Sequence, residues 1–356
     1  MKILIFNWRD ITHPWAGGAE TNIHELAKRW VAMGNQVTLF CSAYPGCKPE
    51  ETIDGIRILR RGTRFTVYLH AFWNYLTRLR KEKYDVVIDD INGVPFFTPL
   101  YVRKPKISII HHLVKGIFFK ELKFPLSWLA YAAEQFVMPI LYRKGRIITV
   151  SESSKEEIQK LGLKNITVIH NGIDSVCSNS GVKTKNPTIC YVGRTKKYKH
   201  LDILLKLFKE INLPDSSLYI AGDGDSLPNL KELANKLGLN NVEFFGHVSD
   251  DAKAKLLQSS WVFVTPSEKE GWGITVVEAN ACGTPVVAFN VPGLRDSVVD
   301  CKTGFLVDNE RELKEKVLTL LNDANLRDQM SSAAFEWSKN FSWDKSAAKF
   351  IEEIKK

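Results

Sequence analysis

Short apolar runs alternate with longer amphipathic stretches over almost the whole chain. Helical spacing of apolar residues predicts helices at Ala19–Met33, Val67–Lys81 and Glu152–Lys160, among others. The apolar runs, rich in β-branched residues, predict strands at Lys2–Phe6, Gln36–Phe40, Ile56–Leu59, Asp85–Ile88, Ile107–Ile110, Ile147–Val150, Thr167–Ile169, Thr188–Val192, Ser217–Ile220, Val242–Phe245, Trp261–Val264, Pro285–Ala288 and Gly304–Val307. Strands that are apolar on both faces and separated by helices indicate parallel sheets covered on both sides.

The length of the chain indicates more than one hydrophobic core. At 356 residues it is longer than a typical single domain. Residues 171–187 are polar, contain Gly, Asn and Ser, and have no periodicity, so they are predicted to link two domains. The predicted fold class is α/β, with doubly wound Rossmann-like domains at residues 1–170 and 188–339.

The composition is that of an ordinary soluble protein, with 44% hydrophobic and 25% charged residues. No apolar run is long enough to span a bilayer, and the first residues lack the features of a signal peptide. The six cysteines are scattered without a Cys-x-x-Cys pair. We therefore expect a cytoplasmic protein with neither disulfides nor structural zinc.

The net charge of +9 is unevenly distributed. Residues 1–174 hold 25 basic and 16 acidic side chains, whereas the remainder holds 24 of each. The surplus lies within residues 57–123, where 14 basic and 5 acidic residues are interleaved with aromatic ones. The stretch 116–146 mixes bulky apolar residues with Lys and Arg and contains two prolines, which favours an interfacial over a spanning segment. The alternative is that these aromatic residues form core and the basic ones a solvated face.

Candidate chemistry follows the predicted strands, where ligands of open α/β sheets bind. Gly17 and Gly18 open a predicted helix and would offer backbone N–H groups to an anion, although a plain tight turn is the alternative. His111 and His112 end another strand; both could instead be ordinary surface or core histidines.

The second half of the chain holds more candidates. Gly193, Arg194 and Lys199 follow a strand, and the two cations could hold a diphosphate unless they are merely solvated. Further along, Glu270 and Glu278 flank a glycine-containing helix start, Gly271-Trp272-Gly273-Ile274. Carboxylates there could accept hydrogen bonds from sugar and ribose hydroxyls. Alternatively, Glu278 pairs with a buried Arg or Lys.

Taken together, these motifs resemble those of the retaining glycosyltransferases of family 4, which have the GT-B fold of two Rossmann-like domains. The resemblance covers nearly the whole chain. Its motifs are Gly17-Gly18-Ala19-Glu20, a strand-end histidine, Ser151-Glu152, Asn171–Asp174, Val192–Arg194, Lys199, the Glu270 and Glu278 pair, and Gly283–Ala288. The sequence departs from the family at Trp272, where Phe is commoner, and at His200, where Gly often follows the lysine.

The resemblance implies roles for these residues. Arg194 and Lys199 would hold the donor diphosphate, and Glu270 would bind hydroxyls of the donor sugar. The catalytic set would be His111, Arg194, Lys199 and Glu270. The donor-binding residues would be Gly17, Gly18, Gly193, Gly271, Trp272, Gly273, Ile274 and Glu278, with Glu278 taking the ribose hydroxyls. The resemblance also implies that the final helix, at about residues 340–356, packs on the first domain.

A metal site is not predicted. Asp223-Gly224-Asp225 has the Asp-x-Asp spelling that holds a divalent ion in other glycosyltransferases. It follows a strand and precedes a helix, where Asp is a usual turn or capping residue. The resembled family carries a glycine-rich loop without metal at this place. We therefore expect no cofactor beyond the nucleotide-diphosphate sugar that serves as donor substrate.

The resulting hypothesis is a retaining, metal-independent hexosyltransferase with a lipid-linked or glycan acceptor in cell-envelope glycoconjugate or glycan synthesis. It would be peripheral on the anionic inner face of the cell membrane. The alternatives are a nucleotide-sugar epimerase or phosphorylase of the same fold, or a non-enzymatic protein that binds membrane or nucleic acid. No nucleic-acid partner is expected, because that reading leaves Arg194, Lys199, Glu270 and Glu278 without a role.

Overall fold

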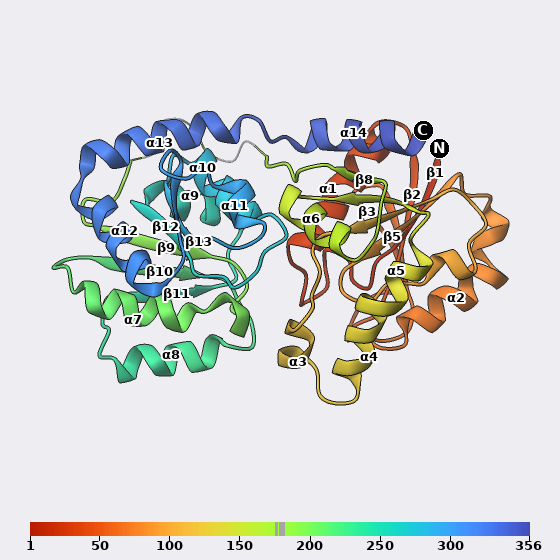
Figure 1. Ribbon diagram of the computed structural model, residues 1–356, viewed down its shortest axis with the longest axis horizontal. Coiled ribbons are helices and arrows are strands. Elements are labelled where there is room, and N and C mark those ends of the chain that lie inside the picture. Colours follow the sequence, from red (N-terminus) through yellow and green to blue (C-terminus); the bar gives the residue numbers. More distant parts are fainter. Residues whose placement is uncertain (175–176, 178–181) are drawn as a thin grey trace. The chain divides into compact units, whose positions relative to one another are not determined.

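The computed structural model of the protein describes residues 1–174, 177 and 182–356 (Figure 1). The chain divides into two compact units. Unit 1 contains Met1–Gly172 and Trp343–Lys356, and unit 2 contains Ile173–Ser342. The predicted linker at 171–187 includes residues 175–176 and 178–181, which lie outside the described residues.

Unit 1 is built on an eight-stranded sheet with the order β3-β4-β2-β1-β5-β6-β7-β8. Every neighbouring pair is parallel except β3 and β4. The strands are β1 (Lys2–Phe6), β2 (Gln36–Cys41), β3 (Glu50–Ile53), β4 (Ile56–Arg60), β5 (Val86–Ile91), β6 (Lys106–Ile110), β7 (Arg146–Thr149) and β8 (Ile166–Val168). Strands β1, β5 and β6 are central, so the residues that follow them are held close together at the carboxyl edge of the sheet.

The helices of unit 1 are α1 (Gly18–Ala32), α2 (Val67–Thr77), α3 (Ile117–Glu121), α4 (Leu126–Ala132), α5 (Met138–Leu141), α6 (Glu152–Lys160) and α14 (Trp343–Lys355), with 3-10 turns at Leu79–Glu82 and Thr98–Leu100 and a π-helical turn at Ala133–Val137. The final helix, α14, packs on α1. The Trp30 indole N–H donates to the carbonyl of Ala347 at 3.2 Å, and the rings of Trp30 and Phe350 are 4.9 Å apart. The end of the chain thus belongs to the core of unit 1.

Unit 2 is built on a fully parallel six-stranded sheet with the order β11-β10-β9-β12-β13-β14. Its strands are β9 (Thr188–Val192), β10 (Ser217–Ala221), β11 (Val242–Gly246), β12 (Val262–Thr265), β13 (Val286–Phe289) and β14 (Gly304–Val307). Its helices are α7 (Leu201–Ile211), α8 (Leu227–Lys236), α9 (Asp250–Ser259), α10 (Ile274–Ala281), α11 (Leu294–Ser297), α12 (Glu310–Asn322) and α13 (Ala324–Ser338), with a 3-10 turn at Lys197–Lys199. One core cluster joins the sheet to α7, α8 and α12, and a second joins it to α9, α10 and α11, so both faces are covered.

The predicted fold class is confirmed, because both units are doubly wound α/β structures with essentially parallel sheets. All the strands named from the sequence are present, with bounds shifted by at most three residues. Strand β3 was not predicted. It forms a hairpin with β4 through Asp54 and Gly55, whose φ angles of 47° and 77° make a tight turn. The strand is short and polar, so its sequence carries little apolar signal.

The expectation that the cysteines form no disulfide is wrong. Cys177 is joined to Cys282, whose Cα atom lies 5.1 Å from that of Cys177 although 105 residues separate them in sequence. Cys282 directly follows α10. Spacing along the chain cannot reveal such a pair, because the fold alone brings the two sulfur atoms within bonding distance.

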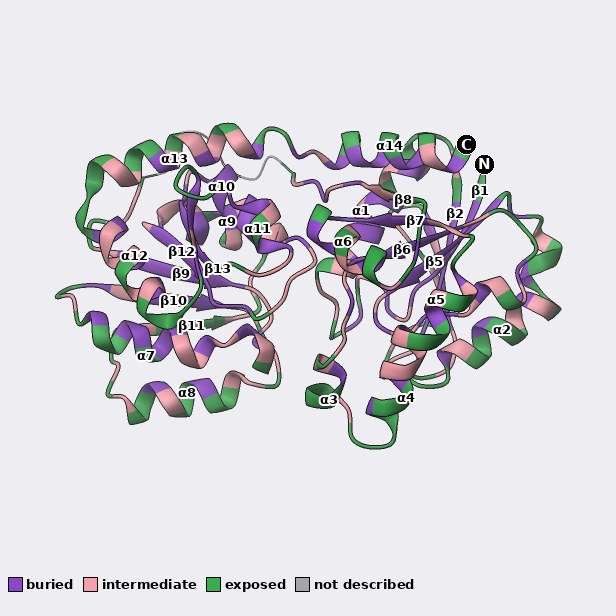
Figure 2. Ribbon diagram, in the orientation of Figure 1, coloured by how far each residue is buried: buried purple, intermediate pink, exposed green. Residues whose placement is uncertain are grey.

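Large apolar residues are exposed mainly on unit 1. Figure 2 shows exposed residues, in green, along α2, α3 and α4 of this unit. On α2 the exposed large apolar residues are Leu69, Phe72 and Trp73, at 71%, 42% and 66% exposed. A second group runs from α3 to α5 and consists of Phe119, Phe124, Leu126, Trp128, Leu129, Phe136, Val137 and Ile140. Among the described residues of unit 2, only Val182 and Phe245 are large apolar residues of this exposed kind. The aromatic residues of the basic stretch are therefore not all core.

Candidate active site

In unit 2 the loops after β9 and β10 approach each other closely. The Gly193 N–H donates to the carbonyl of Ala221 at 2.9 Å, and Thr195 donates in the same way to Asp223. Gly222 has a φ of 128°, and a Cβ atom placed there would lie 1.9 Å from the Gly193 carbonyl oxygen. Only glycine fits this position. The predicted diphosphate loop, Gly193–Lys199, is therefore fixed against a second strand-end loop.

Lys199 and Glu270 form an ion pair within unit 2. The lysine ends a 3-10 turn, and its Nζ contacts Oε1 of Glu270 and lies 5.1 Å from the centre of the Tyr198 ring. Both side chains are largely buried, at 11% and 21% exposed. This pairing excludes the alternative that Lys199 is a solvated surface cation. Burial lowers the pKa of Lys199, but the adjacent carboxylate of Glu270 outweighs that effect and the pKa is raised.

The backbone conformation at His200 is one that glycine adopts readily, which agrees with the glycine expected after this lysine. His200 has a φ of 51° and a ψ of 40°, which place it in the left-handed region at the start of α7. Glycine adopts that conformation without strain, whereas histidine adopts it at a cost. The His200 ring is anchored 3.3 Å from Glu268, whose backbone N–H donates to the Tyr198 carbonyl. The substitution therefore preserves the loop.

The glycines before α10 shape the second part of this site. Gly273 is the N-cap of the helix with a φ of 88°, and a Cβ atom there would lie 3.0 Å from Leu294. Trp272 is buried and its ring packs edge-on against Phe341 at 5.1 Å. The tryptophan that replaces the commoner Phe is thus an anchor for the loop, while Gly271 and Gly273 leave the backbone uncovered by side chains.

Glu278 lies one turn inside α10 and pairs with Lys253 of α9, with 2.7 Å between Oε1 and Nζ. The sequence analysis left open whether Glu278 pairs with a basic residue, and the structure shows that it does. The carboxylate keeps 13% of its side chain exposed. Burial lowers the pKa of Lys253, and the nearby Glu278 and Asp250 more than reverse this, so the pKa is raised. A lysine partner explains how a charged group is tolerated in an apolar helix.

The Asp223 loop is held by internal contacts. Asp223 Oδ1 accepts from the Gly224 N–H at 2.7 Å, and Asp225 pairs with Lys196. Within the described part of the chain, no group of three His, Cys, Asp or Glu side chains is arranged to hold a metal ion.

In unit 1, His111 ends a chain of buried hydrogen bonds across three neighbouring strands. His111 Nε2 lies 2.8 Å from Asp90 Oδ1, and the Asn7 side-chain amide donates to Asp90 Oδ2 at 2.8 Å. Asn7 follows β1, Asp90 lies in β5, and His111 follows β6. Burial raises the pKa of Asp90, partly offset by His111. The geometry fixes the orientation of the imidazole ring.

The Gly17–Gly18 helix start is occupied by a carboxylate of its own chain. Glu20 accepts the Gly17 N–H at 2.8 Å, and its other oxygen accepts from Arg9 and from Asn92, both at 2.9 Å. Glu20 is 1% exposed. The Gly17 N–H is therefore already paired, and Arg9 supplies the positive charge at this point.

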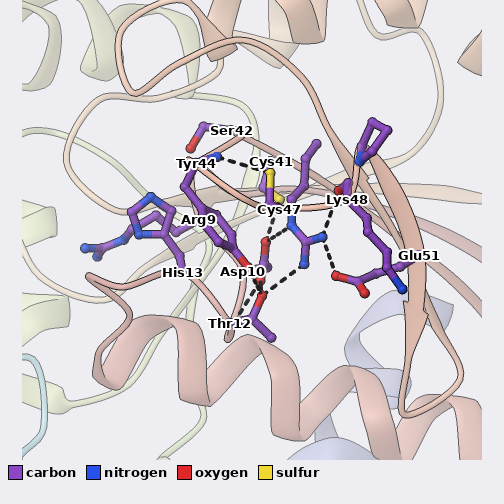
Figure 3. Close-up of polar contacts among 12 residues, drawn as sticks. Arg9, Asp10, Thr12, His13, Cys41, Ser42, Tyr44, Cys47, Lys48 and Glu51 are labelled. Atoms are coloured by element: carbon purple, nitrogen blue, oxygen red, sulfur yellow. Dashed lines mark hydrogen bonds and ion pairs between the residues drawn. The ribbon is translucent and has the colours of Figure 1, made fainter. Parts of the chain in front are cut away.

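A second buried cluster lies beside this loop (Figure 3). Asp10 Oδ2 accepts from Arg60 Nε at 2.6 Å, and neither side chain is exposed. Arg60 also pairs with Glu51, and Asp10 also accepts from the Thr12 N–H at 2.8 Å. Burial raises the pKa of Asp10, but the bonds from Arg60 and Thr12 outweigh it and the pKa is lowered. Arg60 lies within the basic stretch 57–123, but it does not contribute to an exposed basic face, because its charge is internal.

The sequence thus predicted the candidate residues at the strand ends but not the residues that contact them. Asn7, Asp90 and Lys253 orient or balance His111 and Glu278 but lie far from them in sequence. The one available signal was Asp89-Asp90 at the end of an apolar strand, where a charged pair needs a partner.

Comparison with known proteins defines the class. Residues 16–176 match the model of the family described as Glycosyltransferase Family 4, and residues 176–337 match that described as Glycosyl transferases group 1. An uncharacterized glycosyltransferase of Methanocaldococcus jannaschii is 34% identical over 350 residues, covering 97% of this chain and 95% of that protein. The chain therefore belongs to the family 4 glycosyltransferases, and it is an enzyme of that class.

Solved structures share the fold. The sucrose-phosphate synthase of Thermosynechococcus elongatus superposes with a TM-score of 0.82 at 18% identity, covering 99% of this chain and 98% of that one. The Anabaena protein HepE, solved in complex with UDP and glucose, superposes with a TM-score of 0.78 at 18% identity, covering 100% and 99%. The fold is GT-B. Of the helices described, none is both long and apolar enough to cross a membrane.

Proposed function

We propose that the protein is a retaining, metal-independent hexosyltransferase that uses a nucleotide-diphosphate sugar and a lipid-linked or glycan acceptor. The observation that carries this proposal is the buried Lys199–Glu270 pair beside the glycine-flanked start of α10. Binding of UDP and glucose by HepE, a protein of the same fold, is consistent with this donor class.

In this proposal the donor is held by unit 2. Lys199 and Arg194 stabilise the negative charge that develops on the departing diphosphate, aided by the N-terminus of α10. Glu270 accepts hydrogen bonds from the sugar hydroxyls, and Glu278 accepts them from the ribose. Each carboxylate pairs with a lysine, Lys199 or Lys253, and has further lone pairs with which it would accept these hydrogen bonds.

We assign the acceptor to unit 1. His111, oriented by Asp90, lies at the carboxyl edge of the sheet of this unit. Among the residues that the structure describes we identify no nucleophile for a covalent intermediate, so we propose attack by the acceptor hydroxyl on the face that the diphosphate leaves. A leaving phosphate oxygen takes the proton of that hydroxyl, which gives retention of configuration at the anomeric carbon.

We further propose that unit 1 docks on the anionic inner face of the cell membrane. The exposed side chains of α3 to α5 combine Phe124, Trp128 and Ile140, at 81%, 54% and 76% exposed, with the exposed Lys120 and Lys123. Monomeric soluble proteins rarely expose apolar patches of this kind without a partner, and basic residues near an anionic surface contribute about 1 kcal/mol each.

The experiment is a product analysis with the full chain. The pure protein is incubated with a panel of nucleotide sugars and lipid extracts, and products are identified by mass spectrometry. We expect a glycosylated lipid or glycan whose anomeric proton coupling shows the configuration of the donor. An inverted anomer would refute the mechanism, and epimerised donor without transfer would favour the epimerase alternative.

Metal independence is tested in the same assay. Transfer is expected to continue in EDTA at an unchanged rate, since no ligand set among the described residues suits a divalent ion. Loss of activity that magnesium or manganese restores would contradict this, and would direct attention to Asp223 and Asp225.

A further inference from the structure

Unit 1 contains a cavity of about 320 Å³ between the loop after β1, the start of α2, the loop after β5, and the α3 to α4 segment. Its walls are mainly apolar and aromatic; they include Trp8, Tyr68, Phe97, Phe118, Leu129 and Ala133. The volume is at the lower end of the range for small-molecule sites, roughly 300–1,000 Å³. The cavity can therefore hold part of a ligand of moderate size.

One cation, Arg64, lines the cavity. Its guanidinium carbon lies 5.8, 5.5 and 5.4 Å from the ring centres of Trp8, Trp15 and Phe65. Across the described residues, no carboxylate pairs with Arg64, whereas Arg9, Arg57 and Arg60 of the same unit each do. A guanidinium held among aromatic faces without a counter-ion is suited to a phosphate.

The cavity is continuous with two features of unit 1. On one side its lining includes Leu126 and Leu129, which are 43% and 63% exposed and belong to the apolar surface described above, and Phe65, which is 55% exposed. On the other its lining includes Asn92, which donates to Glu20, the residue that caps the Gly17 helix start. The cavity thus extends from the exposed apolar surface to the strand-end loops.

We propose that this cavity is a subsite for an acceptor lipid: it takes the hydrocarbon chain next to the head group, and Arg64 binds the phosphate that joins chain and head. The proposal rests on the proposed transferase function and names the class of its acceptor, a phosphate-linked lipid. A glycan chain is disfavoured as occupant, because it would need many polar partners and the lining offers few. An apolar chain matches the walls, and its phosphate would supply the counter-ion that Arg64 lacks.

The test uses n-decyl phosphate as probe and isothermal titration calorimetry on the full chain, below the micellar concentration. Ethyl phosphate and 1-decanol are the head and chain controls. Decyl phosphate should bind at least about tenfold more tightly than either. Equal affinity for ethyl and decyl phosphate would overturn the chain site.

Three variants locate the probe. Ala133→Phe fills the cavity and should weaken decyl phosphate and decanol binding about tenfold, whereas Ala132→Phe, one residue away and outside the lining, should not. Leu129→Asn, at an exposed wall position, repeats the test if the larger side chain disturbs folding. Arg64→Gln should weaken decyl phosphate alone, with Arg80→Gln as the matched control. Wild-type affinity in Ala133→Phe and Leu129→Asn would refute the proposal.

Two further readouts separate this proposal from the proposed function. UDP binding, assigned to unit 2, should be the same in all these variants. If decyl phosphate binds as expected but no lipid phosphate is ever glycosylated, the subsite stands and the transferase proposal is wrong. If lipid phosphates are glycosylated equally by wild type and Ala133→Phe, the transferase proposal stands and the subsite is wrong.

Discussion

The two units have the same kind of fold but differ in what they leave at their surfaces. Unit 1 holds 29 basic and 18 acidic side chains, a net +11, whereas unit 2 holds 20 and 22, a net −2. Nearly all the exposed large apolar side chains described belong to unit 1. Both units have the same kind of sheet, so the difference does not come from the fold. It agrees with the partners proposed above, a small polar donor for unit 2 and an amphiphilic acceptor and a membrane for unit 1.

The units also differ in how they use buried charge. In unit 1, the Asp10–Arg60 and Glu20–Arg9 pairs are almost completely buried and fix loops. In unit 2, Glu270 and Glu278 pair with lysines but remain 21% and 13% exposed. The Asp10–Arg60 pair has no access to solvent and can only hold structure, whereas the partly accessible pairs of Glu270 and Glu278 can exchange a partner for a ligand. This distinction can be tested on each side.

The largest effect is expected on the stability of unit 1. Asp10→Ala leaves the buried Arg60 with Glu51 as its remaining carboxylate and should lower the free energy of unfolding by about 4 kcal/mol. Urea denaturation followed by tryptophan fluorescence measures this. As a control, Glu50→Ala removes an exposed partner of Arg57 and should cost less than about 1 kcal/mol. An equal loss of unfolding free energy in the two variants would show that burial does not determine how strongly these ion pairs stabilise the fold.

On the other side of the comparison, Lys199→Ala and Glu270→Ala should abolish activity and leave unit 2 folded. Loss of a charge contact to the transition state costs on the order of 3 kcal/mol, roughly a hundredfold in rate. The transfer rate is measured with saturating donor, and circular dichroism checks the fold. Lys197→Ala changes an exposed lysine of the same 3-10 turn and should be near normal. Near-normal turnover in both test variants would remove these residues from the mechanism.

The surface difference predicts selective membrane binding. In liposome flotation at low salt, the protein should prefer anionic over neutral vesicles, and Lys120→Glu with Lys123→Glu should weaken binding by about 2 kcal/mol. Reversal of Lys206 and Lys209 on α7 of unit 2 is the matched control and should have little effect. No preference for anionic vesicles would refute docking, and an unchanged double variant would place it elsewhere on unit 1.

How far the sequence predicts this molecule depends on whether the signal is local. Strand β9 is an uninterrupted apolar run, and a glycine ends it before the loop to Lys199, so the strand and the position of the loop after it were predictable. The partners of the site were not, because Asp90 lies 21 residues from His111, Lys253 lies 25 from Glu278, and Cys177 lies 105 from Cys282. The burial of Arg60 could not be predicted either. A basic residue at the end of a strand gives the same sequence pattern whether its partner is water or Asp10.

The smallest effect concerns a lysine in unit 2 that has no carboxylate partner at hydrogen-bonding distance. Lys183 donates to the Ser260 carbonyl at 2.8 Å and to Thr284 Oγ1 at 2.7 Å, and burial lowers its pKa to about 8. Since the unfolded chain holds this proton up to about pH 10.4, it binds more protons than the folded protein between those values, and stability rises with pH there. From pH 7 to pH 9 the contribution of Lys183 should grow by about 1 kcal/mol. The measurement is urea denaturation of wild type and Lys183→Met at both pH values: the wild type should gain this amount relative to the variant. A parallel pH dependence in the two proteins would show that Lys183 does not titrate in this window.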